Sequence, residues 1–115
     1  MKAQIIELLT KLKSKSISFG DVLAFIEQHY QHTPTAFKNG QAYNGTDQNQ
    51  GSAKVFSFAK INHLNATDTL LLFAEHYQSV LESPNGSDHQ NIRQFMINGW
   101  LGVVFEGDAL TAKQS

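Results

Sequence analysis

Apolar residues recur at the spacing of an α-helix in the first third of the chain. Their pattern predicts an amphipathic helix from about Lys2 to Ser14, with charged residues on the opposite face. A second helix is predicted after Ser18, whose side chain can cap the first turn. This helix should end near His32, because the residue before Pro34 avoids the helical region of backbone space.

The pattern changes to short, alternating runs after these two helices. The pair Asn39-Gly40 separates two such runs and is typical of a two-residue hairpin turn. We therefore predict paired strands at Thr35–Lys38 and Gln41–Asn44. The polar segment that follows, GTDQNQGS, predicts a loop, and its spacing does not fit a phosphate-binding loop.

Two further helices are predicted in the middle of the chain. The segment SAKVFSFAKINHL has features of both a strand and a helix, and the pair Gly51-Ser52 at its start favours a helix. The segment NATDTLLLFAEHYQSVLES places its apolar residues on one face and predicts a single long helix. Pro84-Asn85-Gly86 should end that helix.

A fifth helix and a strand are predicted near the C-terminus. Ser87 and Gln90 have the spacing of a capping box, so this helix should run from Asp88 to about Ile97. Asn98-Gly99 is typical of a helix end. The segment WLGVVFEG is rich in β-prone residues and predicts a strand over residues 100–106.

These elements predict a single α+β domain over residues 1–115. About five helices would pack on a small antiparallel sheet, which combines the hairpin at 35–44 with the strand at 100–106. Residues 110–115 should form a loose tail. A chain of 115 residues, of which 41% are hydrophobic, is long enough and apolar enough to bury one core.

Composition excludes several classes of function. Nine basic and ten acidic residues give a formal charge of −1, whereas nucleic-acid binding needs a basic face, so we predict no nucleic-acid partner. The chain has no cysteine, which excludes disulfides, thiol nucleophiles and cysteine-ligated metals. No apolar stretch approaches the length of a transmembrane span, so we predict no membrane partner and a cytoplasmic location.

The segment DHQNIRQFMINGW, residues 88–100, holds the strongest candidates for functional residues. On a helical wheel, one arc of this segment is apolar and should face the core: Ile92, Phe95 and Met96. Three polar residues border that arc: His89, Asn91 and Arg93. Side chains at such a border are half-buried, which suits either a structural role or a binding role.

Two interpretations fit this position. The first is structural, with Arg93 bonded to loop carbonyls or to a carboxylate of Glu106, Asp108 or Asp47. The second is a site in which Arg93 holds an anion or a small polar ligand, with His89 as a hydrogen-bond donor or acceptor. The pattern favours the structural interpretation and leaves the site open as the alternative.

Other candidates for chemistry are weaker. Glu27, His29 and His32 have a spacing that could hold a divalent metal, but histidines near a helix C-terminus are more often exposed. We therefore predict no metal and no cofactor. The sequence also lacks a Gly-x-Ser-x-Gly nucleophile motif, and no catalytic residue is identified.

Several segments match the pattern of one known family. They are HTPTAF at residues 32–37, FKNG, NQGSAKVFSFAKI, DHQNIRQFMINGW, and the residues Phe105-Glu106-Gly107 and Ala109-Leu110. Together they resemble the HopJ-type family of small proteobacterial proteins, which is named after a type III effector. The matching motif positions are Asn39, Gly40, Asn49, Gly51, Ser52, His89, Asn91, Arg93, Gly99 and Trp100. The resemblance implies no particular reaction. It adds delivery into a host cell by type III secretion as an alternative to a cytoplasmic location.

We therefore predict a HopJ-type binding protein that acts through an unknown protein partner or a small polar or anionic ligand, as a monomer or a weak homodimer. The candidate ligand-binding residues are His89, Asn91, Arg93, Trp100, Asn49 and Ser52. One alternative is a small hydrolase- or isomerase-like enzyme with His89 and Arg93 in a pocket floored by Trp100 and the loop Thr46–Gln50. The other alternative is a structural or dimerising domain with no ligand.

Overall fold

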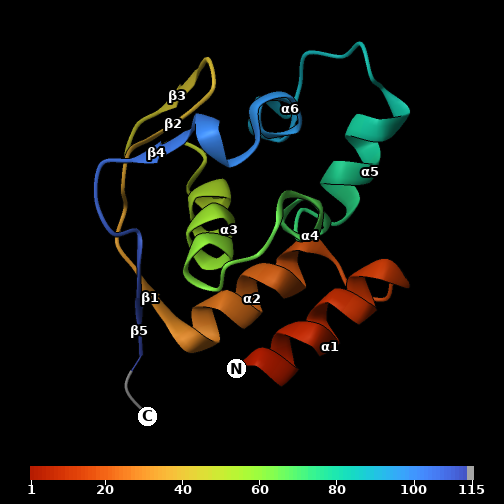
Figure 1. Ribbon diagram of the computed structural model, residues 1–115, viewed down its shortest axis with the longest axis vertical. Helices are drawn as coiled ribbons and strands as arrows, with labels where there is room; N and C mark the ends of the chain where they lie inside the picture. Colours follow the sequence, from red (N-terminus) through yellow and green to blue (C-terminus); the bar gives the residue numbers. More distant parts are fainter. Residues whose placement is uncertain (114–115) are drawn as a thin grey trace.

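Six α-helices pack around one another and against two small antiparallel sheets in the computed structural model, which describes residues 1–113 (Figure 1). The helices are α1 (Lys2–Lys13), α2 (Phe19–His29), α3 (Gln50–Ile61), α4 (Ala66–Leu71), α5 (Glu75–Glu82) and α6 (Gln90–Asn98). The strands are β1 (Tyr30–His32), β2 (Phe37–Asn39), β3 (Ala42–Asn44), β4 (Val103–Phe105) and β5 (Leu110–Ala112), and a 3₁₀ helix, η1 (Gly99–Gly102), precedes β4. The predicted α+β class is confirmed.

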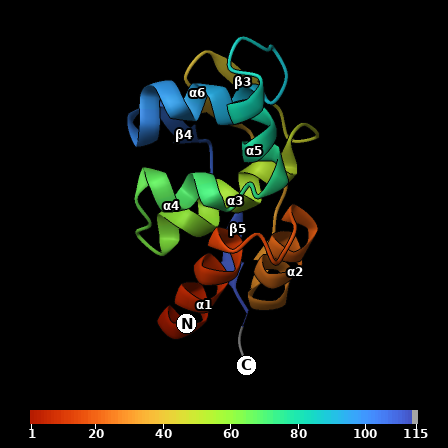
Figure 2. The ribbon, with the colours of Figure 1, turned by 90° about the vertical axis from the view of Figure 1, so that its right-hand side faces the viewer.

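Helices α1 and α2 lie at one end of the molecule, and α6 lies with the β2–β3 hairpin at the other end (Figures 1 and 2). The apolar face of α1 packs into the core through Ile5, Leu8, Leu9 and Leu12. Helix α2 is preceded by Ser18, whose hydroxyl oxygen accepts from the Asp21 N–H, while the Asp21 carboxylate accepts from the Ser18 N–H. Both predicted helices are therefore confirmed, although α2 ends at His29 rather than near His32.

Helix α3 runs through the middle of the molecule and supplies the centre of the core (Figure 1). Phe56 is fully buried there. The centroid of its ring lies within 6.2 Å of the ring centroids of Phe37, Phe73, Phe95 and Trp100. One α3 side chain thus packs against rings from β2, α6, η1 and the α4–α5 connection. The helical interpretation of the ambiguous segment is confirmed.

Strands β2 and β3 form the predicted hairpin, and β4 pairs with the other edge of β2, which gives the order β3-β2-β4. The turn lies one residue later than predicted, because Asn39 pairs with Ala42 and leaves Gly40 and Gln41 as the turn. Gly40 has a φ of 58°, and a Cβ there would collide with the Gln94 side chain of α6. The positive φ favours glycine at this position, and any other residue would also require the Gln94 and Asn98 side chains of α6 to move.

The second sheet is not predicted by the sequence pattern. Strands β1 and β5 pair antiparallel, with Gln31 opposite Thr111. The expectation of a loose tail is therefore wrong for residues 110–112, and residues 114 and 115 lie outside the described residues. Strands of three residues are too short to produce a clear alternation, and the partners are far apart in sequence.

The strand predicted over residues 100–106 is shorter than expected. Gly99–Gly102 form η1, so only Val103–Phe105 of the predicted strand pair with β2. The Gly40 N–H donates to the Gly102 carbonyl at 2.9 Å, and a Cβ on Gly102 would lie 3.1 Å from the Gly40 nitrogen. This close contact between two backbone segments stabilises η1, which replaces the first part of the predicted strand.

The single long helix predicted over residues 65–83 is divided into α4 and α5. Ala74 has φ 51° and ψ −123°, a conformation that residues with a Cβ rarely adopt. Leu72 and Phe73 at this break are buried, with exposures of 0% and 2%. The apolar pattern identifies the buried residues but not the bend, because helical periodicity does not encode where the chain turns.

Replacing Ala74 with glycine should raise the free energy of unfolding by about 1 kcal/mol, because glycine adopts a positive φ without Cβ strain. Chemical denaturation followed by circular dichroism measures the change. Ala24→Gly is the matched control, since Ala24 is exposed within α2 and its replacement should lower stability by about 1 kcal/mol. A loss of stability in both variants would contradict the strain assigned to Ala74.

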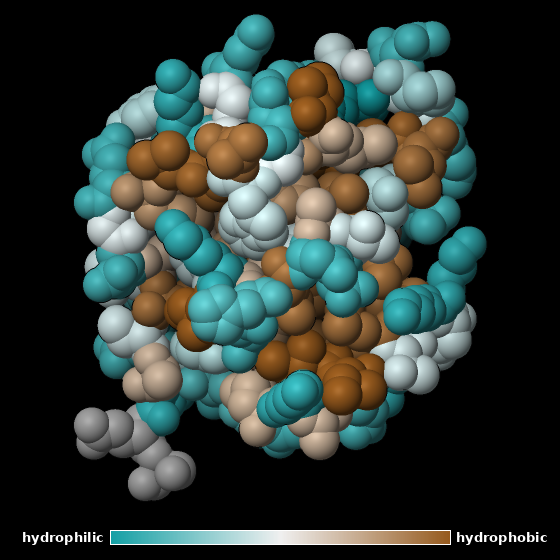
Figure 3. Space-filling model, in the orientation of Figure 1, coloured by the Kyte–Doolittle hydropathy of each residue, from teal (hydrophilic) through white to brown (hydrophobic). Residues whose placement is uncertain are grey.

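Several large apolar side chains remain on the surface. The most exposed are Leu101 (97%), Ile97 (74%) and Tyr43 (61%). On the face seen in Figure 3, apolar groups form separate areas bordered by polar groups. Dimerisation through such a surface stays a prediction. Within residues 1–113, every helix is too short or too polar to cross a bilayer.

Candidate functional site

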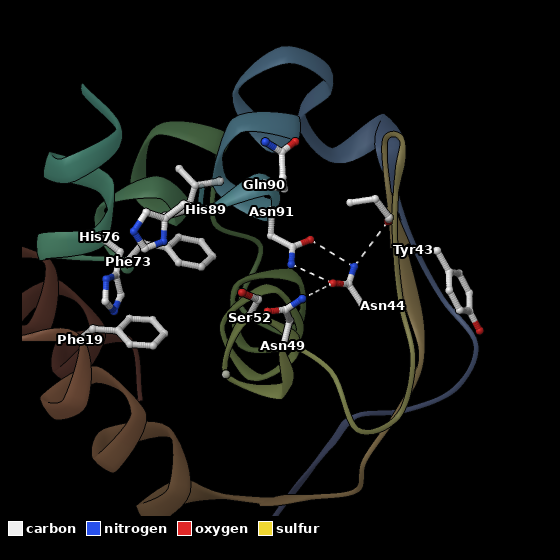
Figure 4. Close-up of a pocket in the computed structure, with 13 residues that line it drawn as sticks. Phe19, Tyr43, Asn44, Asn49, Ser52, Phe73, His76, His89, Gln90 and Asn91 are labelled. Atoms are coloured by element: carbon white, nitrogen blue, oxygen red, sulfur yellow. Dashed lines mark hydrogen bonds between the residues drawn. The ribbon is translucent and has the colours of Figure 1, made fainter. Parts of the chain in front are cut away.

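An open cleft lies where the first turns of α3 and α6 meet β3, α5 and the start of α2 (Figure 4). We call it the α3–α6 cleft, and its volume is about 490 Å³. Its lining residues are Phe19, Ala42, Tyr43, Asn44, Asn49, Gly51, Ser52, Phe73, His76, His89, Gln90, Asn91 and Ile92. The cleft therefore draws on segments that are far apart in the sequence.

Four asparagines form a hydrogen-bonded network beside the cleft. Asn91 donates to Asn44 Oδ1 at 2.9 Å and accepts from Asn44 Nδ2 at 3.2 Å, so the two buried carboxamides pair with each other (Figure 4). Asn49 donates to the same Asn44 oxygen at 2.7 Å. Asn39 donates to the backbone and side-chain oxygens of Asn91 at 2.7 and 3.1 Å. The network joins β2 and β3 to the starts of α3 and α6, and it fixes the shape of the cleft.

Both helices begin at the cleft after a residue in the left-handed conformation. Asn49 has a φ of 50° before α3, and His89 has a φ of 51° before α6. Neither side chain accepts a hydrogen bond from the first turn of its helix, in contrast to Ser18 at the start of α2. The first-turn N–H groups and the positive dipole ends of two helices therefore meet at the cleft.

Four rings gather on the side of the cleft opposite the carboxamides (Figure 4). Phe19 stacks on Phe73, with ring centroids 5.9 Å apart and ring planes within 9° of parallel. The His76 ring centroid lies 4.8 Å from that of Phe19 and 5.1 Å from that of His89. We call these four residues the ring wall. Phe73 is buried, whereas the other three rings are partly exposed.

The lining of the cleft contains no Asp, Glu, Lys or Arg among the residues that the structure describes. The Asp88 carboxylate lies 3.8 Å from His89 Nε2, but Arg93 binds it at 2.6 Å. The hydrogen bond from Arg93 is the main cause that holds the pKa of Asp88 below its ordinary value, and the nearby His89 acts in the same direction. The cleft thus offers N–H, hydroxyl and imidazole groups to a ligand.

Arg93 does not line the cleft. It donates to the Asp88 carbonyl at 2.6 Å, to the Ser83 carbonyl at 2.8 Å and to Asp88 Oδ1 at 2.6 Å, and its side chain is 10% exposed. These bonds tie the α5–α6 connection to α6, which is the loop-carbonyl arrangement of the structural interpretation. The carboxylate partners suggested by the sequence are not the ones used: Glu106, Asp108 and Asp47.

Trp100 also lies outside the cleft. Its Nε1 donates to the Leu64 carbonyl at 3.1 Å, and its ring packs edge-on against Phe56 and Phe95. Trp100 therefore holds η1 against the α3–α4 connection. The pocket expected for the enzyme alternative, with His89 and Arg93 above Trp100, is not formed by the described residues.

Four of the six predicted site residues line the cleft: Asn49, Ser52, His89 and Asn91. The sequence reasoning missed Asn44, Phe19 and His76. Phe19 is an apolar residue at a helix start and His76 lies within the helix predicted over residues 65–83, so no local pattern marks either one. A signal for Asn44 exists in the segment NGQAYNGTDQNQ at residues 39–50, which holds six amide side chains.

The predicted start of α6 is wrong. The helix begins at Gln90 after His89, and Gln90 Nε2 donates to the Ser87 carbonyl at 2.7 Å instead of accepting in a capping box. Met96, expected in the core, is 44% exposed, whereas Asn91, expected at the border, is 7% exposed. Because Asn91 is buried with its hydrogen-bond partners, α6 is rotated about its axis relative to the orientation that its apolar residues predict.

The histidines near the end of α2 have other contacts. His32 Nε2 lies 3.1 Å from Gln50 Oε1, and the His29 ring packs on Phe25 with centroids 4.7 Å apart. Within residues 1–113, no group of three His, Cys, Asp or Glu side chains is placed to hold a metal ion.

Comparison with known proteins extends over nearly the whole chain. The family model described as HopJ type III effector protein matches residues 5–110. The crystal structure of the unknown function protein VPA0580 is similar, with a TM-score of 0.86 and 44% sequence identity, over 93% of this chain and 92% of that chain. No curated protein matches the sequence.

Proposed function

This chain belongs to the HopJ type III effector protein family, and we propose that it is a binding protein whose α3–α6 cleft holds a small anionic molecule. The observation that carries this proposal is the meeting of two uncapped helix starts in one cleft that has no carboxylate among its described lining residues. Helix N-termini favour negative charge through their free N–H groups and their dipole.

The side chains around the helix starts support the same class of ligand. His76 and His89 bring two imidazoles to the cleft, and the Ser52 hydroxyl lies in the first turn of α3. Each can donate a hydrogen bond to an anionic oxygen. The carboxylate near His89 is that of Asp88. Arg93 pairs with this carboxylate, so its negative charge repels an anionic ligand less.

The size and rigidity of the cleft also support a small ligand. A volume of about 490 Å³ lies in the range of small-molecule sites. Asn44 of β3 is bonded to Asn91 at the start of α6 and to Asn49 just before α3, which fixes both helix starts relative to β3. Little ordering is therefore required when a ligand binds.

Isothermal titration of the full chain with inorganic phosphate tests the proposal. We expect saturable binding by the wild type and about tenfold weaker binding by His89→Gln, because one charge-assisted hydrogen bond is lost. His63→Gln is the matched control, since His63 also has a positive φ, 56°, but lies outside the cleft. No binding by the wild type, or an equal loss in both variants, would overturn the proposal.

Two broader parts stay proposals: delivery by a type III apparatus, which the family description suggests, and action through a protein partner. Ligand binding in the cleft requires neither of them. A cytoplasmic location is equally compatible with the cleft.

A further inference from the structure

The cleft has two chemically different sides, and the ring wall is not explained by an anion alone. Phe19, His76 and His89 expose ring surface to the cleft, while Asn44, Asn49 and Asn91 lie across from them (Figure 4). Exposure of an apolar phenyl ring to water is unfavourable, and the polar groups beside the ring do not offset that free-energy cost. A ligand that covers the ring would remove that apolar surface from water.

Phe19 is held in a fixed position at the cleft. Its backbone N–H donates to the Glu75 carboxylate at 2.8 Å, and its ring is parallel to the buried ring of Phe73. A Cβ on Gly51 would lie 3.5 Å from Phe19 Cε2, so the ring also packs against the first turn of α3. The ring is therefore a preformed surface between α3 and α5, and a ligand does not have to order it.

The carboxamides across the cleft can bind the edge of a ring that contains nitrogen or oxygen. Asn44 Oδ1 accepts hydrogen bonds from both Asn49 and Asn91, which orients the amide nitrogens of those two residues. The Asn49 side chain has its oxygen left to accept a hydrogen bond, because its nitrogen is the donor to Asn44. A planar ligand between the two sides would meet ring faces on one side and amide groups on the other.

We infer that the ligand of the α3–α6 cleft is a planar heteroaromatic ring that carries an anionic group, either a phosphate or a carboxylate. The ring lies against Phe19 and His76, and the anionic group lies at the starts of α3 and α6. Stacking on an aromatic side chain accepts many rings, because every such ring has a π-face. This inference rests on the proposed function and adds the ring to it.

Titration with three probes tests the ring separately from the anion. The probes are adenosine 5′-monophosphate, nicotinate and ribose 5-phosphate, of which the last has an anionic group but no aromatic ring. For the wild type we expect at least one ring-bearing probe to bind about tenfold more tightly than ribose 5-phosphate. This comparison needs no variant, so it holds even where a substitution prevents folding.

Two variants then locate the ring. Phe19→Leu should abolish the preference for the ring-bearing probe and leave ribose 5-phosphate binding unchanged. Phe25→Leu is the matched control, because Phe25 is on the same helix and packs on His29 but lies outside the cleft. We expect this variant to keep the preference.

The outcomes separate this inference from the proposed function. Equal affinity for all three probes, or an equal loss of affinity for every probe in Phe19→Leu, would contradict the inferred aromatic ring but not the proposed anion site. Failure of all three probes and of inorganic phosphate to bind would overturn both.

Discussion

Replacing Asn91 with alanine is expected to lower the free energy of unfolding by about 2–3 kcal/mol, because buried amide groups lose their hydrogen-bond partner. In the wild type, Asn91 is 7% exposed and exchanges two hydrogen bonds with Asn44, which is 2% exposed. Asn39 also donates to the Asn91 side chain, at 3.1 Å. Urea denaturation of the two proteins measures the difference.

Asn49→Gly is the control for this prediction, because glycine keeps the positive φ of Asn49, 50°, without Cβ strain. Asn49 belongs to the same network, but it is exposed and donates a single hydrogen bond to Asn44. Its replacement should cost about 1 kcal/mol or less. If the two variants lose stability equally, burial of the Asn44–Asn91 pair is not what holds the hairpin to α6.

Replacing Arg93 with alanine is expected to lower the free energy of unfolding by about 2 kcal/mol, since its side chain is 10% exposed and is bonded to loop carbonyls. The loss should include packing, because the aliphatic stem of an arginine covers apolar surface. A thermal melt measures the change. The α5–α6 connection would no longer be tied to α6.

Two controls distinguish this role from ligand binding. Asp88→Asn removes the negative charge that pairs with Arg93 but keeps the bonds of Arg93 to the Asp88 and Ser83 carbonyls, so its loss of stability should be smaller. Folded Arg93→Ala should still bind phosphate, though more weakly than the wild type, because the Asp88 carboxylate beside His89 loses its opposing charge. An unchanged melting temperature together with lost phosphate binding would show instead that Arg93 is a ligand residue.

The longer helices are predictable from the sequence because each buries a broad apolar stripe. Helix α1 matches its predicted range within a residue, and the Ser18 cap locates α2. The break between α4 and α5 depends on the backbone of Ala74, where packing of Leu72 and Phe73 overrides helical periodicity. No local sequence signal encodes that bend.

The pairing of β1 with β5 is the part of the fold that the sequence does not reveal, whereas the predicted pairing of the hairpin with the strand that follows η1 is confirmed. His32 of β1 lies opposite Leu110 of β5, and each strand has three residues. A strand this short has no clear alternation of apolar and polar side chains. The hairpin was predictable because its signal is local. Its turn lies one residue later than predicted because Asn39 is a buried strand residue that donates a hydrogen bond to Asn91.

The candidate site is partly predictable for a similar reason. His89 and Asn91 stand out by residue type next to apolar neighbours, and both line the cleft. Asn44 could be assigned to the site only through its contact with Asn91, which is 47 positions away. Arg93 carries the same local signal as His89, yet the rotation of α6 turns it toward the α5–α6 connection.

The most direct test of an anion site at the α3–α6 cleft is a titration of the folded, ¹⁵N-labelled chain with inorganic phosphate, followed by ¹H–¹⁵N correlation spectra. We predict that the backbone amide signals of Gly51, Ser52, Gln90 and Asn91 shift together and saturate at one common concentration. Shifts confined to the lysine-containing end of α1, at residues 11–15, with the four cleft amides unmoved, would contradict the account.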